Sequence, residues 1–218
     1  ENGDPGMIFL DRINKDNPTP QLGPIEAVNL CGEQPLLPYE ACNLGSINLT
    51  KFLVVATRGS PASSIDWKHL GEVVAIAVRF LDNVIDAGRY PLSKVDRVVK
   101  SNRKIGLGVM GWADFLIKMG IGYNSHEALK LAERVMKFFT ETAHETSRNL
   151  GKEKGSFTNF KGSTWQKKFK YKWMRNSTTT TISPTGSISM VADVSSGIEP
   201  LFALSYYKEV MGGQRFFE

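Results

Sequence analysis

Long helical patterns alternate with short β-prone runs along this chain of 218 residues, and this alternation constrains its fold most. An apolar face with helical spacing runs from residue 66 to about 87, where Asp66 suits the N-cap and Gly88 the stop. A second apolar face begins at Ser125 and continues to about Leu150. Because alternating helices and strands are typical of α/β proteins, we predict an α/β fold.

Shorter elements complete the predicted pattern. We expect a short strand or helix at residues 7–13, a helix from about 92 to 101 and another that ends at Gly120. Residues 45–55 are rich in apolar and β-prone types. The further expected strands are residues 104–110, 178–182 and 188–194.

The two cysteines of the chain lie eleven residues apart, in a segment punctuated by Pro and Gly that begins Asn29-Leu-Cys31-Gly-Glu33 and reaches Cys42. On an extended backbone alternate residues share a face, so Asn29, Cys31 and Glu33 are expected to project together. An amide can orient a hydroxyl group, a carboxylate can accept its proton, and sulfur can act as nucleophile or radical. The alternative is that both cysteines are buried and structural, as free cysteines often are.

A second candidate site is a turn that follows the predicted strand at residues 178–182. Glycine lets the backbone approach an anion there, while hydroxyl groups and successive N–H groups supply donors. Ligands of α/β folds commonly bind where a strand ends. An ordinary Ser/Thr turn is the alternative. The residues of this candidate phosphate site are Pro184, Thr185, Gly186, Ser187, Ile188 and Ser189.

A glycine cluster, Gly106-Leu-Gly108-Val-Met-Gly111, spells the dinucleotide-binding fingerprint between a predicted strand and a helix. The acidic residue expected at the end of a second strand is missing, because Glu127 and Glu133 lie inside a predicted helix. We therefore favour tight strand-to-helix packing, and keep an NAD-binding oxidoreductase as the alternative.

Other features point away from nucleic acids, metals and membranes. Residues 161–175 are basic and aromatic, as in some single-strand binders, but solvated surface segments often look the same and a net charge of +5 is modest. The histidines are scattered, so no metal site is expected. No apolar run approaches the ~20 residues of a membrane span.

The ends of the chain and its thiols give further expectations. The start lacks Met and the features of a secretory signal, and the end at Glu218 is abrupt, so we expect an internal piece of a longer protein. Two thiols without a disulfide framework suit the reducing cytoplasm.

Five motifs, in order, resemble the catalytic subunit of ribonucleotide reductases, and they extend over nearly the whole chain. The spacing of the two cysteines is most similar to the adenosylcobalamin-dependent class II branch; class I, which uses a metal-containing radical subunit, is the alternative. The motifs are residues 4–14, 29–49, 103–111, 181–189 and 196–200.

The resemblance implies a fold and a set of partners. Residues 1–218 would form the C-terminal half of the catalytic barrel domain, the second half of a ten-stranded α/β barrel, with a central finger loop at about residues 25–50. The implied cofactor is adenosylcobalamin, with no binding residues assigned. The implied partners are a ribonucleoside di- or triphosphate substrate, an external dithiol such as thioredoxin, and the remainder of the reductase polypeptide.

The resemblance also implies roles for single residues. Cys31 would carry a thiyl radical, Glu33 would accept the proton of the 3′-hydroxyl, and Asn29 would orient the substrate. Cys42 would be one of two redox-active thiols, with its partner cysteine outside this chain. The segment 184–189 would hold the substrate phosphates.

Overall fold

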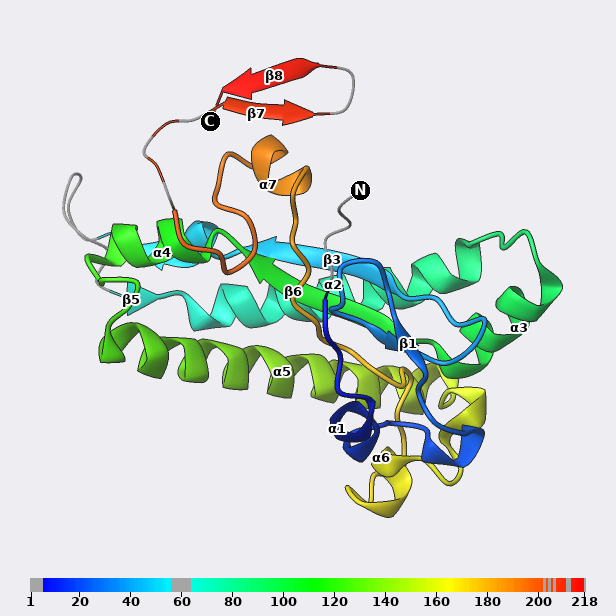
Figure 1. Cartoon of the computed structure of the whole chain (residues 1–218). Coiled ribbons are helices and arrows are strands. Elements are labelled where there is room, and N and C mark those ends of the chain that lie inside the picture. Colours follow the sequence, from blue (N-terminus) through cyan, green and yellow to red (C-terminus); the bar gives the residue numbers. More distant parts are fainter. Residues whose placement is uncertain are drawn as a thin grey trace.

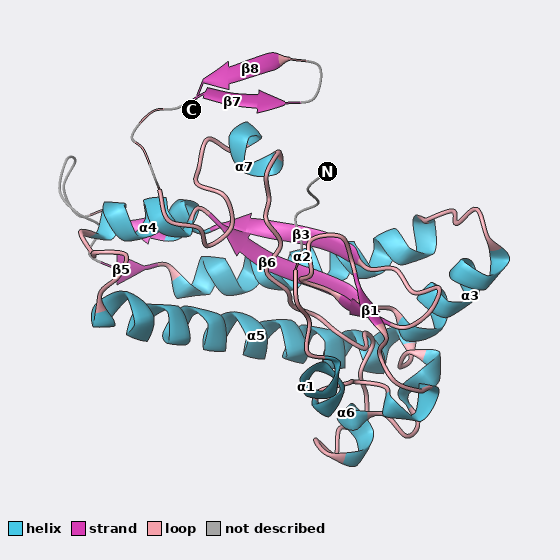
Figure 2. Ribbon diagram, in the orientation of Figure 1, coloured by secondary structure: helices cyan, strands magenta, loops and turns pink. Residues whose placement is uncertain are grey.

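The structure is a computed structural model that describes residues 6–55, 64–201, 203, 205, 207–210 and 213–217. Asp4 and Pro5 of the first family-like motif, and Glu218, lie outside the described residues. The helices are α1 (Leu10–Lys15), α2 (Trp67–Ala87), α3 (Ser93–Asn102), α4 (Trp112–Met119), α5 (His126–Lys154), α6 (Thr164–Lys167) and α7 (Ile188–Val191), with the 3₁₀ turns η1 (Pro20–Leu22), η2 (Leu49–Phe52) and η3 (Thr158–Phe160). The strands are β1 (Ala27–Val28), β2 (Pro35–Leu36), β3 (Asn43–Asn48), β4 (Leu53–Val54), β5 (Ser64–Ile65), β6 (Ile105–Met110), β7 (Tyr207–Val210) and β8 (Gln214–Phe217). The presence of both helices and strands confirms the α/β class (Figure 2).

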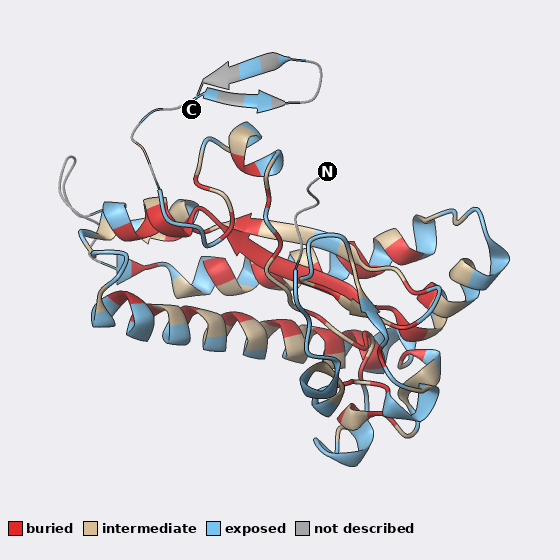
Figure 3. Cartoon of the chain, viewed as in Figure 1, coloured by how far each residue is buried: buried red, intermediate tan, exposed pale blue. Residues whose placement is uncertain are grey.

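Strand β6 is the centre of a parallel arrangement. On one edge it pairs with β3, with Asn43 opposite Ile105. On its other edge Leu107 forms a parallel bridge with Thr180 and donates its N–H to the Thr179 carbonyl at 2.9 Å. All six residues of β6 are buried, as Figure 3 shows, which is usual for a strand with parallel neighbours and covered faces. The strand predicted at residues 104–110 is therefore confirmed, and residues 178–182 run along it as an extended segment.

Helix α2 lies between β3 and β6 in the chain and packs against both strands and against α5, which runs along the sheet in Figure 1. The Asp66 side chain caps α2 by accepting the His69 N–H at 3.0 Å, and Gly88 follows its last residue. Ser125 caps α5 through the Ala128 N–H at 3.1 Å. Both predicted helix starts are confirmed, and α5 continues past residue 150 to 154.

The strand predicted at residues 188–194 is wrong, because this segment begins with the short helix α7. The Ser189 N–H donates to the Thr185 carbonyl at 2.9 Å, and Val191 is 90% exposed. β-branched residues form strands when a pleated surface is available to pack against. Both edges of β6 are already occupied by β3 and residues 178–182, so this segment cannot pair with that strand.

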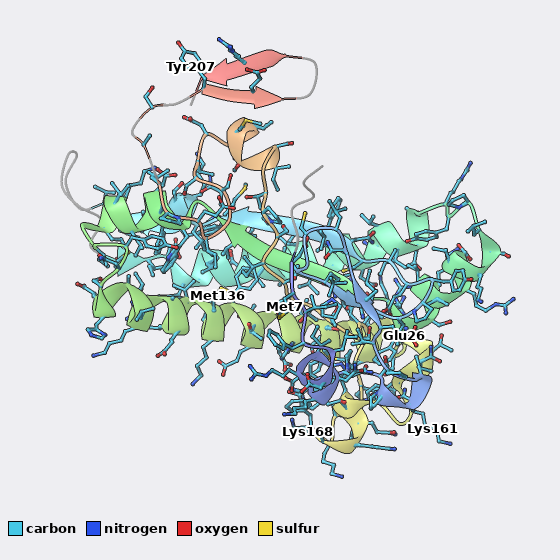
Figure 4. The ribbon with its side chains drawn as sticks, viewed as in Figure 1. Met7, Glu26, Met136, Lys161, Lys168 and Tyr207 are labelled. Atoms are coloured by element: carbon cyan, nitrogen blue, oxygen red, sulfur yellow. The ribbon has the colours of Figure 1, made fainter. Side chains whose placement is uncertain are left out.

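Residues 161–175 pack around a second, smaller core. Trp165 lies in this core with Phe157 and Met174, and its Nε1 donates to the Ser177 carbonyl at 2.8 Å. Figure 4 shows Lys161 and Lys168 beside α6, at the end of the molecule away from α7. In the described part of the chain, no helix is both long enough and apolar enough to cross a membrane.

Candidate active site

The first cysteine lies in the turn of a β-hairpin. Strands β1 and β2 pair antiparallel, with Val28 opposite Pro35, and residues 29–34 connect them. The Asn29 side-chain oxygen accepts the Gln34 N–H at 3.0 Å, and Gly32 has a φ of +84°. The extended backbone predicted for residues 29–33 is therefore wrong: the Asn side chain and the left-handed Gly close a tight turn.

The turn carries a thiol and a carboxylate, and one oxygen of this carboxylate accepts no hydrogen bond from the described residues. Cys31 is exposed and its thiol is free. The Oε2 atom of Glu33 is buried and has no hydrogen-bond partner among the described residues. A buried carboxylate oxygen without a donor is costly, so Glu33 is a natural place for a ligand hydroxyl group.

The hairpin turn is tied to the segment that leads into the candidate phosphate site. The Thr181 hydroxyl donates to the Glu33 carbonyl at 2.7 Å, across 148 positions of sequence. Two residues further along this segment, the Ser183 hydroxyl oxygen lies 3.4 Å from that of Ser46 on β3. Residues 181–183 thus bring the start of the phosphate site to the loop that carries Cys31.

Within residues 184–189, two hydroxyl groups hold the loop in place. The Thr185 hydroxyl accepts the Gly197 N–H at 2.7 Å, and the Ser189 and Ser196 hydroxyl oxygens lie 3.0 Å apart. Both Thr185 and Ser189 are buried, whereas Pro184, Ser187 and Ile188 are exposed. The motif at residues 196–200 therefore holds this loop through hydrogen bonds, and the sequence did not predict this contact.

Cys42 lies immediately before β3 and is half-buried, with a free thiol. Its Sγ donates to the Asn43 carbonyl at 3.4 Å. Burial of the thiol raises the pKa of Cys42 to about 12; the positive charge of Lys104 opposes this shift, and the carboxylates of Glu40 and Glu33 add to it. The thiol is consequently protonated at neutral pH.

Sequence reasoning missed a buried ion pair beside Cys42. The Nζ of Lys104 lies 2.7 Å from the Glu40 Oε2, and both side chains are almost completely buried. The Lys104 Nζ also donates to the Pro35 carbonyl at 2.8 Å. The available signal was a lysine at the start of an otherwise apolar strand, and nothing in the sequence indicated its partner.

The glycine cluster serves close packing, which supports the packing interpretation over the dinucleotide-binding alternative. A Cβ on Gly108 would lie 2.2 Å from the Thr181 carbonyl oxygen, because the neighbouring backbone already fills that space. The start of α4 is also occupied, since the Gly111 N–H donates to the Ser195 carbonyl at 2.8 Å. No group of three or more potential metal-ligating side chains occurs within the described ranges.

Fold and loops define an α/β domain with a cysteine-bearing hairpin held at its sheet. The chain belongs to the ribonucleotide reductase family: residues 1–218 match the family described as "Ribonucleotide reductase, barrel domain". This match confirms the resemblance seen in the sequence motifs.

Three relatives show how the similarity is distributed. The vitamin B12-dependent ribonucleoside-diphosphate reductase of Thermoplasma acidophilum is 53% identical over 215 residues, which cover 99% of this chain and 27% of the relative. Its namesake from Mycobacterium tuberculosis is 47% identical over 210 residues, covering 96% of this chain and 29% of the relative. The ribonucleoside-diphosphate reductase subunit alpha of Chlamydia trachomatis is 31% identical over an alignment of 253 residues, which covers 98% of this chain and 24% of the relative. The chain thus spans less than a third of the length of these relatives.

Proposed function

We propose that this chain is part of a ribonucleotide reductase, an enzyme that reduces ribonucleotides to 2′-deoxyribonucleotides for DNA synthesis, and that the chain alone is incomplete and inactive. The observation that carries the proposal is the Thr181–Glu33 hydrogen bond, which joins the cysteine-bearing hairpin to the start of the candidate phosphate site. A nucleotide held by its phosphates at residues 184–189 would extend its sugar toward that hairpin. Since the relatives at 53% and 47% identity are named diphosphate reductases, we propose a ribonucleoside diphosphate over a triphosphate.

The proposed architecture is the C-terminal half of a ten-stranded α/β barrel domain, with residues 25–50 as its finger loop. Two features support it: β6 has parallel neighbours on both edges, and the hairpin β1–β2 is tied to one of them. The other half of the barrel would come from the remainder of the polypeptide.

In the proposed reaction a sulfur-centred radical on Cys31 takes the hydrogen atom from C3′ of the ribose. The S–H bond forms, the C–H bond breaks and the unpaired electron moves to the sugar. Glu33 accepts the proton of the 3′-hydroxyl, and the 2′-hydroxyl takes a proton from the redox-active thiol couple of Cys42 and its partner cysteine and leaves as water. The exposed Cys31 and the unpartnered Glu33 Oε2 suit these roles.

Asn29 and Cys42 have supporting roles in this proposal. The oxygen of the Asn29 amide is engaged by the Gln34 N–H, so its NH₂ group is the part that would orient the substrate. Cys42 would supply reducing equivalents with a cysteine outside this chain, and an external dithiol such as thioredoxin would reopen the resulting disulfide. Such exchange fits the cytoplasm, where we place the protein.

The proposed phosphate contacts come from the exposed side of residues 184–189. The Thr185 and Ser189 hydroxyl groups hold the loop itself, and the Ser189 N–H donates to the Thr185 carbonyl. We therefore propose the Ser187 hydroxyl and the main-chain N–H groups of Ser187 and Ile188 as the donors that face an anion. Pro184 would contribute shape, Ile188 only its backbone, and Gly186 would allow close approach.

We also propose adenosylcobalamin as the cofactor, because the relatives at 53% and 47% identity are named vitamin B12-dependent. The described residues do not themselves fit this group. One cavity, of about 250 Å³, is apolar and lies between α4, α5 and β6, and another lies on the surface of α5; neither is lined by Cys31, Glu33 or Cys42. We therefore assign no reaction step to the cofactor.

The proposal is tested with the full-length protein, a ribonucleoside diphosphate, a dithiol and adenosylcobalamin. Cys31→Ala should abolish product formation, because no other described thiol lies at the hairpin tip. Cys42→Ala should prevent sustained product formation, since the remaining thiol cannot close the disulfide that supplies both electrons. Sustained turnover by the Cys31→Ala protein contradicts the proposal. Activity that requires a metal-radical subunit in place of adenosylcobalamin would favour the class I alternative.

A further inference from the structure

The register of the parallel sheet brings Cys42 next to a buried lysine. The first residues paired between β3 and β6 are Asn43 and Ile105. One position earlier on both strands, Cys42 lies beside Lys104, and neighbouring strands are only about 4.8 Å apart. The strand pairing therefore places the backbone of Lys104 next to that of Cys42.

An ion pair and a hydrogen bond hold the Lys104 ammonium group in place. Its Nζ lies 2.7 Å from the Glu40 Oε2 and donates to the Pro35 carbonyl at 2.8 Å. Glu40 in turn accepts the Leu37 N–H at 2.8 Å and the Asn102 side-chain amide at 2.7 Å. Lysine is rarely buried this deeply unless its charge is compensated. These contacts anchor the segment between the two cysteines to the start of β6.

We propose that Lys104 is a positioning residue for the Cys42 thiol: its ammonium group, held by Glu40, anchors the cysteine segment and stabilises the thiolate that Cys42 forms during disulfide exchange. This inference rests on the proposed function, in which Cys42 is a redox-active thiol. The Lys104–Glu40 ion pair would then act in the reduction cycle as well as stabilise the fold.

The step concerned is the reopening of the disulfide between Cys42 and its partner cysteine. A thiolate of the external dithiol attacks the partner sulfur, the S–S bond breaks, and Cys42 leaves as a thiolate with the bonding electron pair before it takes up a proton. The second thiol of the dithiol then closes its own disulfide and releases the partner cysteine. Two electrons and two protons pass from the dithiol to the protein. Lys104 acts on the Cys42 leaving group.

The charged groups around Cys42 have opposite effects, and this makes the inference testable. Lys104 favours the thiolate, whereas Glu40 and Glu33 disfavour it. Removing Lys104 or Glu40 breaks the same anchor. A purely structural role would therefore give the two variants the same effect on the thiol, whereas the proposed role gives opposite effects.

The experiment measures the rate at which iodoacetamide alkylates Cys42 in the full-length protein, by mass spectrometry of the peptide that contains it, at a fixed alkaline pH. Below the pKa of a thiol this rate follows the thiolate fraction, which changes about tenfold for each unit of pKa. Glu40→Gln should raise the rate several-fold, and Lys104→Met should lower it several-fold. Lys104→Arg keeps the charge and should stay near the wild-type rate.

Lys100→Met is the matched control, because Lys100 pairs with Asp96 at 2.6 Å on the exposed side of α3. It should leave the alkylation of Cys42 unchanged. Faster alkylation in both Lys104→Met and Glu40→Gln would show only a loosened segment and would overturn the inference, as would a slower rate in Glu40→Gln alone. The assay needs no turnover, so its result is separate from the Cys42→Ala test of the proposed function.

Discussion

Replacing Gly108 by Ala should separate β6 from its neighbour at residues 178–182. The added Cβ would lie 2.2 Å from the Thr181 carbonyl oxygen, whereas ordinary contact begins at 3.4 Å. That oxygen belongs to backbone, so a side-chain rotation cannot relieve the overlap. The segment that carries Thr181 must move by more than an ångström, and it holds the Glu33 carbonyl through a 2.7 Å hydrogen bond.

The cost of this movement can be worked out from the contacts that it breaks. The Leu107 N–H donates to the Thr179 carbonyl at 2.9 Å, and the Thr181 N–H donates to the Leu107 carbonyl at 3.1 Å. Each lost hydrogen bond costs about 1 kcal/mol. Overpacking of a close-packed core adds about 1–3 kcal/mol. The local opening free energy of this part of the sheet should therefore fall by about 3–5 kcal/mol.

Peptide-resolved amide hydrogen exchange on the full-length protein measures this change directly. Since every 1.4 kcal/mol is a factor of ten, exchange in residues 105–110 and 178–182 should accelerate by at least about a hundredfold. The control is Gly122→Ala, because a Cβ there meets nothing closer than the Ser125 Cβ at 4.0 Å. Equal exchange in the Gly108 and Gly122 variants would refute the packing argument.

Two further predictions concern the acid in the hairpin and the pH dependence of stability. Glu33→Gln should lower kcat by about 10²–10⁴-fold with little change in KM, since an amide cannot take a proton, and the exposed Glu26→Gln serves as control. Burial lowers the pKa of His144, so the unfolded chain binds a proton more readily than the folded one, and stability should fall as the pH drops from about 7.5 to 5.5. This fall in melting temperature should be smaller in His144→Gln than in wild type or the exposed His126→Gln; an unchanged fall would contradict it.

The sequence predicts the helices of this fold well because their ends are encoded locally. Asp66 and Ser125 each cap a long helix through the backbone N–H three residues further on, and Gly88 and Gly120 each follow the last residue of a helix. Such signals depend only on neighbours within one helical turn, so the sequence predicts the helix ends without knowledge of the tertiary structure.

The errors arise where long-range packing or a single side chain decides. Residues 188–194 have the composition of a strand, but the edges of β6 are already taken, and α7 forms instead. Alternation along residues 29–33 indicated one shared face, but the Asn29 side chain closes a turn there. The Lys104–Glu40 pair joins residues 64 positions apart, and no local pattern announces it.

Strand β6 positions every segment of the candidate site. At its start, Lys104 anchors the cysteine segment through Glu40. In its middle, Gly108 admits the backbone of Thr181, whose hydroxyl holds the hairpin. Just past its end, the Gly111 N–H donates to the Ser195 carbonyl and the Trp112 N–H to the Gly197 carbonyl. The Gly197 N–H in turn donates to the Thr185 hydroxyl of the phosphate loop. Because β6 contacts other segments along its whole length, all six of its residues are buried. Its changes should therefore have separable effects: the Lys104 variants on the Cys42 thiolate, and Gly108→Ala on the hairpin.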